Sequence, residues 1–94
     1  MFEIKVDERG WIVPVGRMDA SRIDEAKNVF EAVEQSTTVD MARLDYISSI
    51  GIGVLLATQK RLGESGNKLE LVNANAQIKE VFRLSGLAQI FGIE

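Results

Sequence analysis

The stretch Leu44–Leu62, LDYISSIGIGVLLATQKRL, places two adjacent serines where a strand gives way to a glycine-containing amphipathic helix. Unpaired backbone N–H groups and the positive end of the helix dipole gather at such a helix start. The position therefore tolerates a phosphate on a nearby side chain, and Ser49 is a candidate to carry one. Alternatively, Ser48 or Ser49 is an N-cap, whose oxygen accepts a hydrogen bond from a free amide. This segment alone favours the cap.

Hydrophobic periodicity at the start of the chain predicts a hairpin. Apolar and polar residues alternate from Phe2 to Asp7, which is typical of a strand with one buried face. A turn at 8–10 leads to a second, almost wholly apolar strand at Trp11–Val15. Because proline has no N–H to donate, Pro14 is expected to face away from a neighbouring strand or to lie at a bulge.

Strands and helices are predicted to alternate through the rest of the chain. Caps, glycines and apolar spacings of three and four mark the helices, and short apolar runs mark the strands. The predicted segments are a helix at 21–35 capped by Ser21, a strand at 37–42, a helix at 49–62 closed by Gly63, a strand at 68–73, a helix from its Asn75 cap to Gly86, and a strand at 90–93. We therefore expect one α/β domain over residues 1–94, in the order β-β-α-β-α-β-α-β, with helices packed on a mixed, mostly parallel sheet.

Composition excludes several classes of protein. The 11 Lys and Arg residues are scattered, and the net charge of −3 disfavours nucleic acid as a partner. The chain has no cysteine or histidine, which removes thiolate nucleophiles, the usual zinc ligands and the commonest general base. No apolar run approaches the roughly 20 residues that span a membrane, and the first residues do not resemble a secretory signal. We expect a cytoplasmic protein without enzymatic activity or a membrane partner.

The motifs predict neither nucleotide nor metal binding. Gly51-Ile52-Gly53 departs from a dinucleotide fingerprint, because Leu56 stands where that motif needs glycine or alanine. Its glycines are instead expected to let the helix approach a partner or the sheet closely. The carboxylates of Asp19, Asp40 and Asp45 follow or end strands, and a small carboxylate–metal enzyme is retained as an alternative. We favour caps of turns and helices, and expect no metal and no cofactor.

The remaining notable side chains are assigned to the core or to solvent. Trp11, Phe30 and Phe82 are predicted to be core aromatics. The Lys60–Arg61 pair is predicted to lie on a solvated helix face. Asp40 is expected to be partly buried and hydrogen-bonded.

Four segments, in the right order and spanning essentially the whole chain, resemble the STAS domain family and its bacterial anti-sigma factor antagonists. They are Gly16-Arg17-Met18-Asp19, similar to the family's G-x-L-D; Val39-Asp40-Met41 as the central strand; Leu44 to Leu55, similar to L-x-x-(I/M)-(D/S)-S-x-G-(L/I)-(G/R)-V-L; and Phe82 to Leu87, similar to F-x-L-(S/T)-G-L. Two features depart from the family. Ser48 stands where many phosphorylated members have Asp, and many members continue into a further helix beyond the position of Glu94.

The resemblance implies a switch protein that is itself a kinase substrate. In the family, the serine two residues before the first glycine accepts a phosphate from a partner that is both serine kinase and anti-sigma factor, and here that serine is Ser49. The unphosphorylated antagonist binds this partner and so releases a sigma factor. Phosphorylation breaks the complex, and a PP2C-type phosphatase restores it. Asp19 matches an acidic residue that lies near the phosphoacceptor in the family.

We expect the partner surface to surround Ser49 and to consist of Asp19, Ser48, Ile50, Gly51 and Ile52. The alternative is a STAS interaction or scaffold module that is never phosphorylated and in which Ser49 is only a cap. A sheet flank left uncovered at the end of the chain would favour self-association.

Overall fold

The computed structural model describes residues 1–93, and its sheet confirms the expected α/β class. The five strands form a mixed sheet in which only the N-terminal hairpin is antiparallel. In chain order the elements are β1 (Phe2–Val6), β2 (Ile12–Met18), a 3-10 turn η1 (Ala20–Arg22), α1 (Ile23–Glu31), β3 (Thr37–Asp40), β4 (Leu44–Ile47), α2 (Ser49–Gly63), β5 (Leu69–Val72), α3 (Ala76–Leu84) and α4 (Ala88–Phe91).

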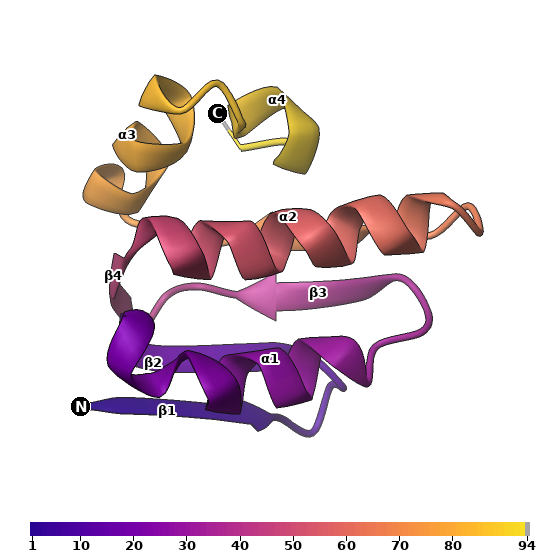
Figure 1. Ribbon diagram of the computed structural model, residues 1–94, viewed down its shortest axis with the longest axis horizontal. Coiled ribbons are helices and arrows are strands. Elements are labelled where there is room, and N and C mark those ends of the chain that lie inside the picture. The colour runs from indigo at the N-terminus through magenta and orange to yellow at the C-terminus, as the bar shows by residue number, and fades with distance from the viewer. Residues whose placement is uncertain (94) are drawn as a thin grey trace.

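The order of strands in the sheet is β1-β2-β3-β5, with β4 also paired to β2. β3 and β4 follow one another along the same side of β2, because Ile12 pairs with Val39 and Gly16 pairs with Leu44. Helices α1 and α2 lie over one face of this sheet, and α3 and α4 lie beyond α2 (Figure 1). Apolar residues from the covered face and from all four helices form the hydrophobic core.

Pro14 lies where β2 exchanges one neighbouring strand for another. Asp7 N donates to Trp11 O at one end of the hairpin and Arg17 N to Met1 O at the other, so the odd-numbered residues of β1 are the hydrogen-bonded ones. Pro14 is paired with Ile4 and therefore turns its nitrogen away from β1, toward the gap between β3 and β4. The predicted orientation of Pro14 is confirmed, because the missing N–H falls where no strand pairs with it.

Two element predictions are wrong. The single strand predicted between the first two helices is instead two strands, because β3 ends at Asp40 and residues 44–47 form the additional strand β4 after a three-residue break. The expected strand at 90–93 is instead the helix α4, which Gly92 ends with a φ of 67°. Its Phe91 packs edge-on against Phe82, with ring centroids 5.4 Å apart, and this contact favours the helix.

Several local predictions can be checked against single contacts. Asn75 caps α3, since its Oδ1 accepts a hydrogen bond from Ile78 N at 2.9 Å, and Gly86 follows the helix with a φ of 76°, as predicted. The predicted cap at Ser21 is wrong, because Asp19 accepts a hydrogen bond from Ser21 N and α1 itself has no side-chain cap. None of the helices in residues 1–93 combines the length and apolar character needed to cross a bilayer.

Of the remaining side-chain assignments, one is corrected. Trp11 is half-buried rather than in the core, and the Arg9 guanidinium lies over its ring at 3.7 Å from the centroid. Lys60 and Arg61 are exposed, as predicted. The Arg61 guanidinium also donates to Val33 O at 2.8 Å and to Phe30 O at 3.0 Å. It thereby satisfies carbonyls at the end of α1 and joins α1 to α2. Phe30 and Phe82 are fully buried, as predicted.

Candidate functional site at the start of helix α2

Ser48 anchors the start of α2 to the end of β2. Its Oγ accepts a hydrogen bond from Gly51 N at 3.3 Å and donates to Met18 O at 3.2 Å. Its backbone N–H also donates to Met18 O, at 3.0 Å. The cap that the sequence assigned to either serine therefore belongs to Ser48.

Ser49 is the first residue of α2 and is exposed. Because Ser48 supplies the cap, the Ser49 hydroxyl has no part in holding the helix start. The free amides and the positive end of the helix dipole lie at the same place. The geometry allows an anion on Ser49 without the loss of a structural contact.

Gly51 allows the start of α2 to approach the sheet closely. A Cβ built at this buried position would lie 2.9 Å from Ile47 Cγ1, 3.1 Å from Met18 O and 3.2 Å from Met18 Cγ. Gly53 is different, since its Cβ would meet nothing within 4 Å. The close-approach interpretation is confirmed for Gly51 with respect to the sheet.

The two isoleucines of the predicted partner surface differ in exposure. Ile50 is 48% exposed, which is unusual for a large apolar side chain. Ile52 is partly buried and packs against the core. Ile50 is therefore the more accessible of the two apolar side chains next to Ser49.

Asp19 follows Met18, whose carbonyl holds Ser48, and so lies next to the start of α2. Its Oδ1 accepts hydrogen bonds from Ser21 Oγ at 2.6 Å and Ser21 N at 3.1 Å. The hydrogen bond from the Ser21 hydroxyl is the main reason that the pKa of Asp19 lies below its usual value, and the nearby Arg17 acts in the same direction. Arg17 Nε lies 3.8 Å from Asp19 Oδ2, and its guanidinium also stacks 4.2 Å from the Tyr46 ring centroid. Asp19 is thus an ionised carboxylate at neutral pH.

A groove of about 630 Å³ between α1 and α2 begins at Ile50. Small and apolar residues of α2 line it, among them Gly53, Val54 and Ala57. The charged side chains along it include Asp24 and Lys27 of α1. Sequence reasoning missed this groove, although two small residues four apart on one helix face are a signal that neighbouring helices leave space there.

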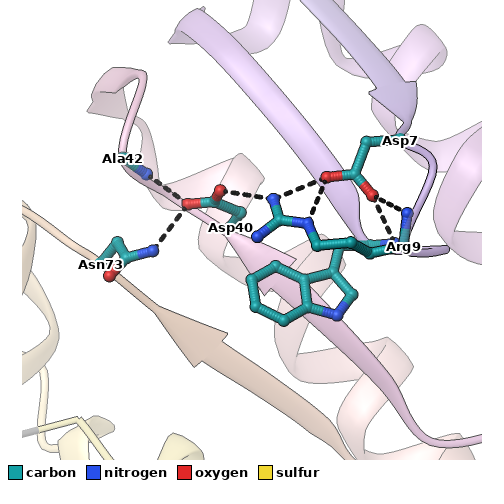
Figure 2. Close-up of polar contacts among 6 residues, drawn as sticks. Asp7, Arg9, Asp40, Ala42 and Asn73 are labelled. Carbon is teal, nitrogen blue, oxygen red and sulfur yellow. Dashed lines mark hydrogen bonds and ion pairs between the residues drawn. The ribbon is translucent and has the colours of Figure 1, made fainter.

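A separate polar cluster joins the hairpin to β3 and β5 (Figure 2). Arg9 Nη2 donates to Asp7 Oδ2 at 2.6 Å and to Asp40 Oδ2 at 3.1 Å. Asp40 Oδ1 also accepts hydrogen bonds from Asn73 Nδ2 and Ala42 N, each at 3.1 Å. These donors, with Asn73 the largest contributor, lower the pKa of Asp40, whose side chain is only 15% exposed. The predicted burial and hydrogen bonding of Asp40 are confirmed.

This cluster is structural, because every charge in it has a partner within the fold. Arg9 and Asn73, which the sequence did not single out, occupy the oxygens of Asp40 that a metal ion would need. Asp45 lies elsewhere, exposed on β4. Within residues 1–93, no three acidic side chains gather closely enough to hold a metal ion.

Comparisons with known sequences point to one family and to one kind of relative. The family model described as "Mlab, STAS domain" matches residues 7–92. BtrV of Bordetella bronchiseptica, named as an anti-sigma factor antagonist, is 38% identical over 60 residues, which cover 64% of this chain and 52% of BtrV. The chain thus spans about half the length of that relative. The anti-sigma-B factor antagonist of Staphylococcus epidermidis is 24% identical over 98% of this chain and 82% of its own length.

Solved structures agree on the fold. The anti-sigma factor antagonist SpoIIAA in its unphosphorylated form superposes with a TM-score of 0.73 at 22% identity, over 95% of this chain and 84% of SpoIIAA. The phosphorylated form of SpoIIAA, a Bacillus cell fate determinant, gives a TM-score of 0.67 at 22% identity, over 95% and 86% of the two chains. At this identity the likeness establishes the fold. The family model, which matches nearly the whole length, shows that the chain belongs to the STAS domain family.

Proposed function

We propose that this protein is an anti-sigma factor antagonist that sequesters a serine kinase/anti-sigma factor and is released when Ser49 is phosphorylated. The proposal rests mainly on one observation at the start of α2, where Ser48 caps the helix and Ser49 is exposed. Two relatives bear the name of anti-sigma factor antagonists, and SpoIIAA, which shares the fold, has been solved with and without its phosphate. Catalysis has no part in this role, and we predict a cytoplasmic location.

The switch acts through charge at a binding surface. A phosphate on Ser49 adds roughly −1.5 to −2 charges next to Ile50, whose exposed apolar side chain is suited to a protein contact. Asp19, a carboxylate that is ionised at neutral pH, adds to the negative charge on this side of the molecule. Burying the phosphate against the partner would require its desolvation, so the phosphorylated form binds less well. A differential affinity of a few kcal/mol suffices for an exchange of partners.

The proposed partner surface has an apolar centre and a polar rim. Ile50 and the accessible part of Ile52 form the centre, and Asp19 and Ser48 form the rim. Gly51 is buried, so its contribution is to hold the helix start against the sheet. A PP2C-type phosphatase is the second proposed partner, because the phosphate has to be removed for the antagonist to bind again.

The phosphoacceptor is tested by mass measurement. After incubation with the cognate kinase and ATP, intact mass and fragment ions are expected to place a single phosphate on Ser49. Ser49→Ala is expected to abolish the modification, whereas Ser48→Ala is expected to retain it. Phosphate on Ser48 alone would refute the assignment.

Phosphorylation is expected to change binding far more than stability. The favourable helix dipole offsets part of the repulsion from neighbouring carboxylates, each effect being on the order of 1 kcal/mol at an exposed site. We therefore expect thermal unfolding of the phosphorylated and unmodified proteins to be similar. A melting temperature lower by more than roughly 8 °C would contradict this, since it exceeds the effect of about 1 kcal/mol in a domain of this size.

Binding is tested with charges placed at matched positions. Ser49→Asp is expected to weaken binding of the anti-sigma partner by more than about tenfold, or ~1.4 kcal/mol. Ala76→Asp is the control, because Ala76 is the exposed first residue of α3 just as Ser49 is of α2. Ile50→Glu and Ile52→Glu are expected to weaken binding as well. Circular dichroism identifies any loss of fold, to which the partly buried Ile52 is the more sensitive.

The scaffold interpretation makes the opposite prediction. If Ser49 has no switching role, a folded Ser49→Asp protein binds its partner as tightly as the wild type, and kinase and ATP leave the mass unchanged. That pair of results would favour a constitutive STAS interaction module.

A further inference from the structure

β1 is an edge strand with a free side. In residues 1–93 it pairs with β2 and with no other strand. The opposite edge of the sheet, at β5, is occupied by the side chain of Gln59, which accepts a hydrogen bond from Leu69 N at 2.6 Å and donates to Leu69 O at 3.2 Å. Within the described chain, β1 is thus an edge that offers unpaired backbone groups to another strand along its whole length.

The hydrogen-bond pattern of the hairpin fixes which residues face that free side. Asp7 N donates to Trp11 O and Arg17 N donates to Met1 O, so the odd-numbered residues of β1 turn their backbone groups toward β2. Phe2, Ile4 and Val6 therefore point their N–H and C=O groups outward. Val6 is 60% exposed, in keeping with an uncovered edge.

On the two sides of Ile4, β1 carries charges of opposite sign at neighbouring positions and apolar residues at the positions beyond. It reads apolar, acidic, apolar, basic, apolar across Phe2-Glu3-Ile4-Lys5-Val6, with Glu3 and Lys5 both exposed. We propose that two copies of this chain associate by antiparallel pairing of their β1 strands, with Ile4 opposite Ile4 of the second copy. Glu3 then lies opposite Lys5 of the second copy and Lys5 opposite its Glu3, while Phe2 and Val6 lie opposite one another.

The charges of Glu3 and Lys5 select this register over its neighbours. Only shifts that keep even-numbered residues opposite one another preserve the hydrogen bonds. Sliding one strand by two residues places Glu3 opposite Glu3, and sliding it the other way places Lys5 opposite Lys5. Like charges directly opposite are unfavourable, so the register centred on Ile4 is the one in which every facing pair is compatible.

Helix α1 fits this arrangement. It packs on both β1 and β2 and so lies near the free edge of the sheet. The two-fold pairing would bring the two α1 helices side by side and antiparallel on the same face of the joined sheet, where helices can pack on one another. The flank of α1 turned away from the groove includes Val29, which is only partly buried in the single chain.

The pairing goes beyond the proposed switch and does not depend on it. Because the two-fold axis reverses the strands, the two Ser49 surfaces would lie at opposite ends of the dimer. Two paired β1 strands, without the area that the α1 helices add, bury less surface than the roughly 1,200–2,000 Å² of a stable interface. A weak dimer is therefore expected.

Sedimentation velocity of the purified chain over a wide range of concentrations tests the pairing. The wild type is expected to pass from monomer to dimer as the concentration rises. Lys5→Glu places two like-charge pairs in the interface and is expected to weaken dimerisation by about tenfold or more, as is Glu3→Lys. The double variant Glu3→Lys/Lys5→Glu restores opposite charges and is expected to restore the dimer.

A backbone variant tests the hydrogen bonds separately. Val6→Pro removes an N–H that points away from β2, so the monomer is expected to fold, as judged by circular dichroism, while the dimer is weakened. A wild type that stays monomeric at the highest concentration would overturn the proposal and leave Lys5 as a charge that guards the edge against pairing. A dimer that the single charge reversals do not weaken, or that the double variant does not restore, would overturn it as well.

Discussion

A pair of glycine substitutions tests how the candidate site is held. Gly51 and Gly53 lie two residues apart in α2, and alanine is the better helix former at both positions by about 0.5–1 kcal/mol. At Gly53 nothing lies within 4 Å of the added Cβ, so Gly53→Ala is expected to raise the free energy of unfolding by that amount. The two variants therefore share one favourable effect and differ only in their surroundings.

At Gly51 the same methyl group meets a backbone atom. Its Cβ would lie 3.1 Å from Met18 O, and this oxygen already accepts hydrogen bonds from the N–H and the hydroxyl of Ser48. Ile47 Cγ1, at 2.9 Å, would have to move as well. Overpacking of this kind typically costs about 1–3 kcal/mol, which exceeds the gain in helix propensity. Gly51→Ala is expected to lower the free energy of unfolding by about 1 kcal/mol net.

Thermal and urea unfolding of the two variants give the measurement. With roughly 4–8 °C per kcal/mol in a domain of this size, we expect Gly51→Ala to melt below the wild type and Gly53→Ala above it. Because the stabilising helix term is common to both, the difference between them isolates the contact with β2 and β4. A Gly51→Ala protein as stable as Gly53→Ala would refute the inference that close approach requires glycine at position 51.

Two further substitution pairs test the cap and the polar cluster. Ser48→Ala is expected to lower the free energy of unfolding by about 1 kcal/mol, whereas Ser49→Ala is expected to leave it nearly unchanged in the same urea titration; equal effects would contradict the assignment of the cap to Ser48. Asp40→Asn is expected to cost about 1–3 kcal/mol at pH 7, with the exposed Asp45→Asn as its control. Because folding lowers the pKa of Asp40, its contribution to the free energy of unfolding is present at neutral pH and is lost as the pH falls below 3.8. The free energies of unfolding of the wild type and of Asp40→Asn should therefore converge in acid. A difference that persists unchanged at low pH would exclude an ionic origin.

Local patterns in the amino-acid sequence were enough to predict much of the fold and the helix start at which the candidate site lies. The alternation of Phe2–Asp7 and the cap-bounded helical periodicities are local patterns, and they predicted the hairpin, α1, α2, α3 and the strands β3 and β5. The serine pair before Gly51 likewise marked a helix start, because N-cap chemistry depends on residues only a few positions apart.

Features that depend on partners far apart in the sequence could not be predicted from such local patterns. Ser48 is the cap and Ser49 is exposed because Met18 O, thirty residues away in sequence, accepts the Ser48 hydroxyl. A strand was predicted over 90–93, but residues 90 and 91 belong to helix α4, in which Phe91 packs on Phe82. Arg9 meets Asp40 only because the hairpin brings it to the end of β3. Local periodicity reports which face of a segment is buried, whereas the identity of the group that covers it depends on the packing of the whole chain.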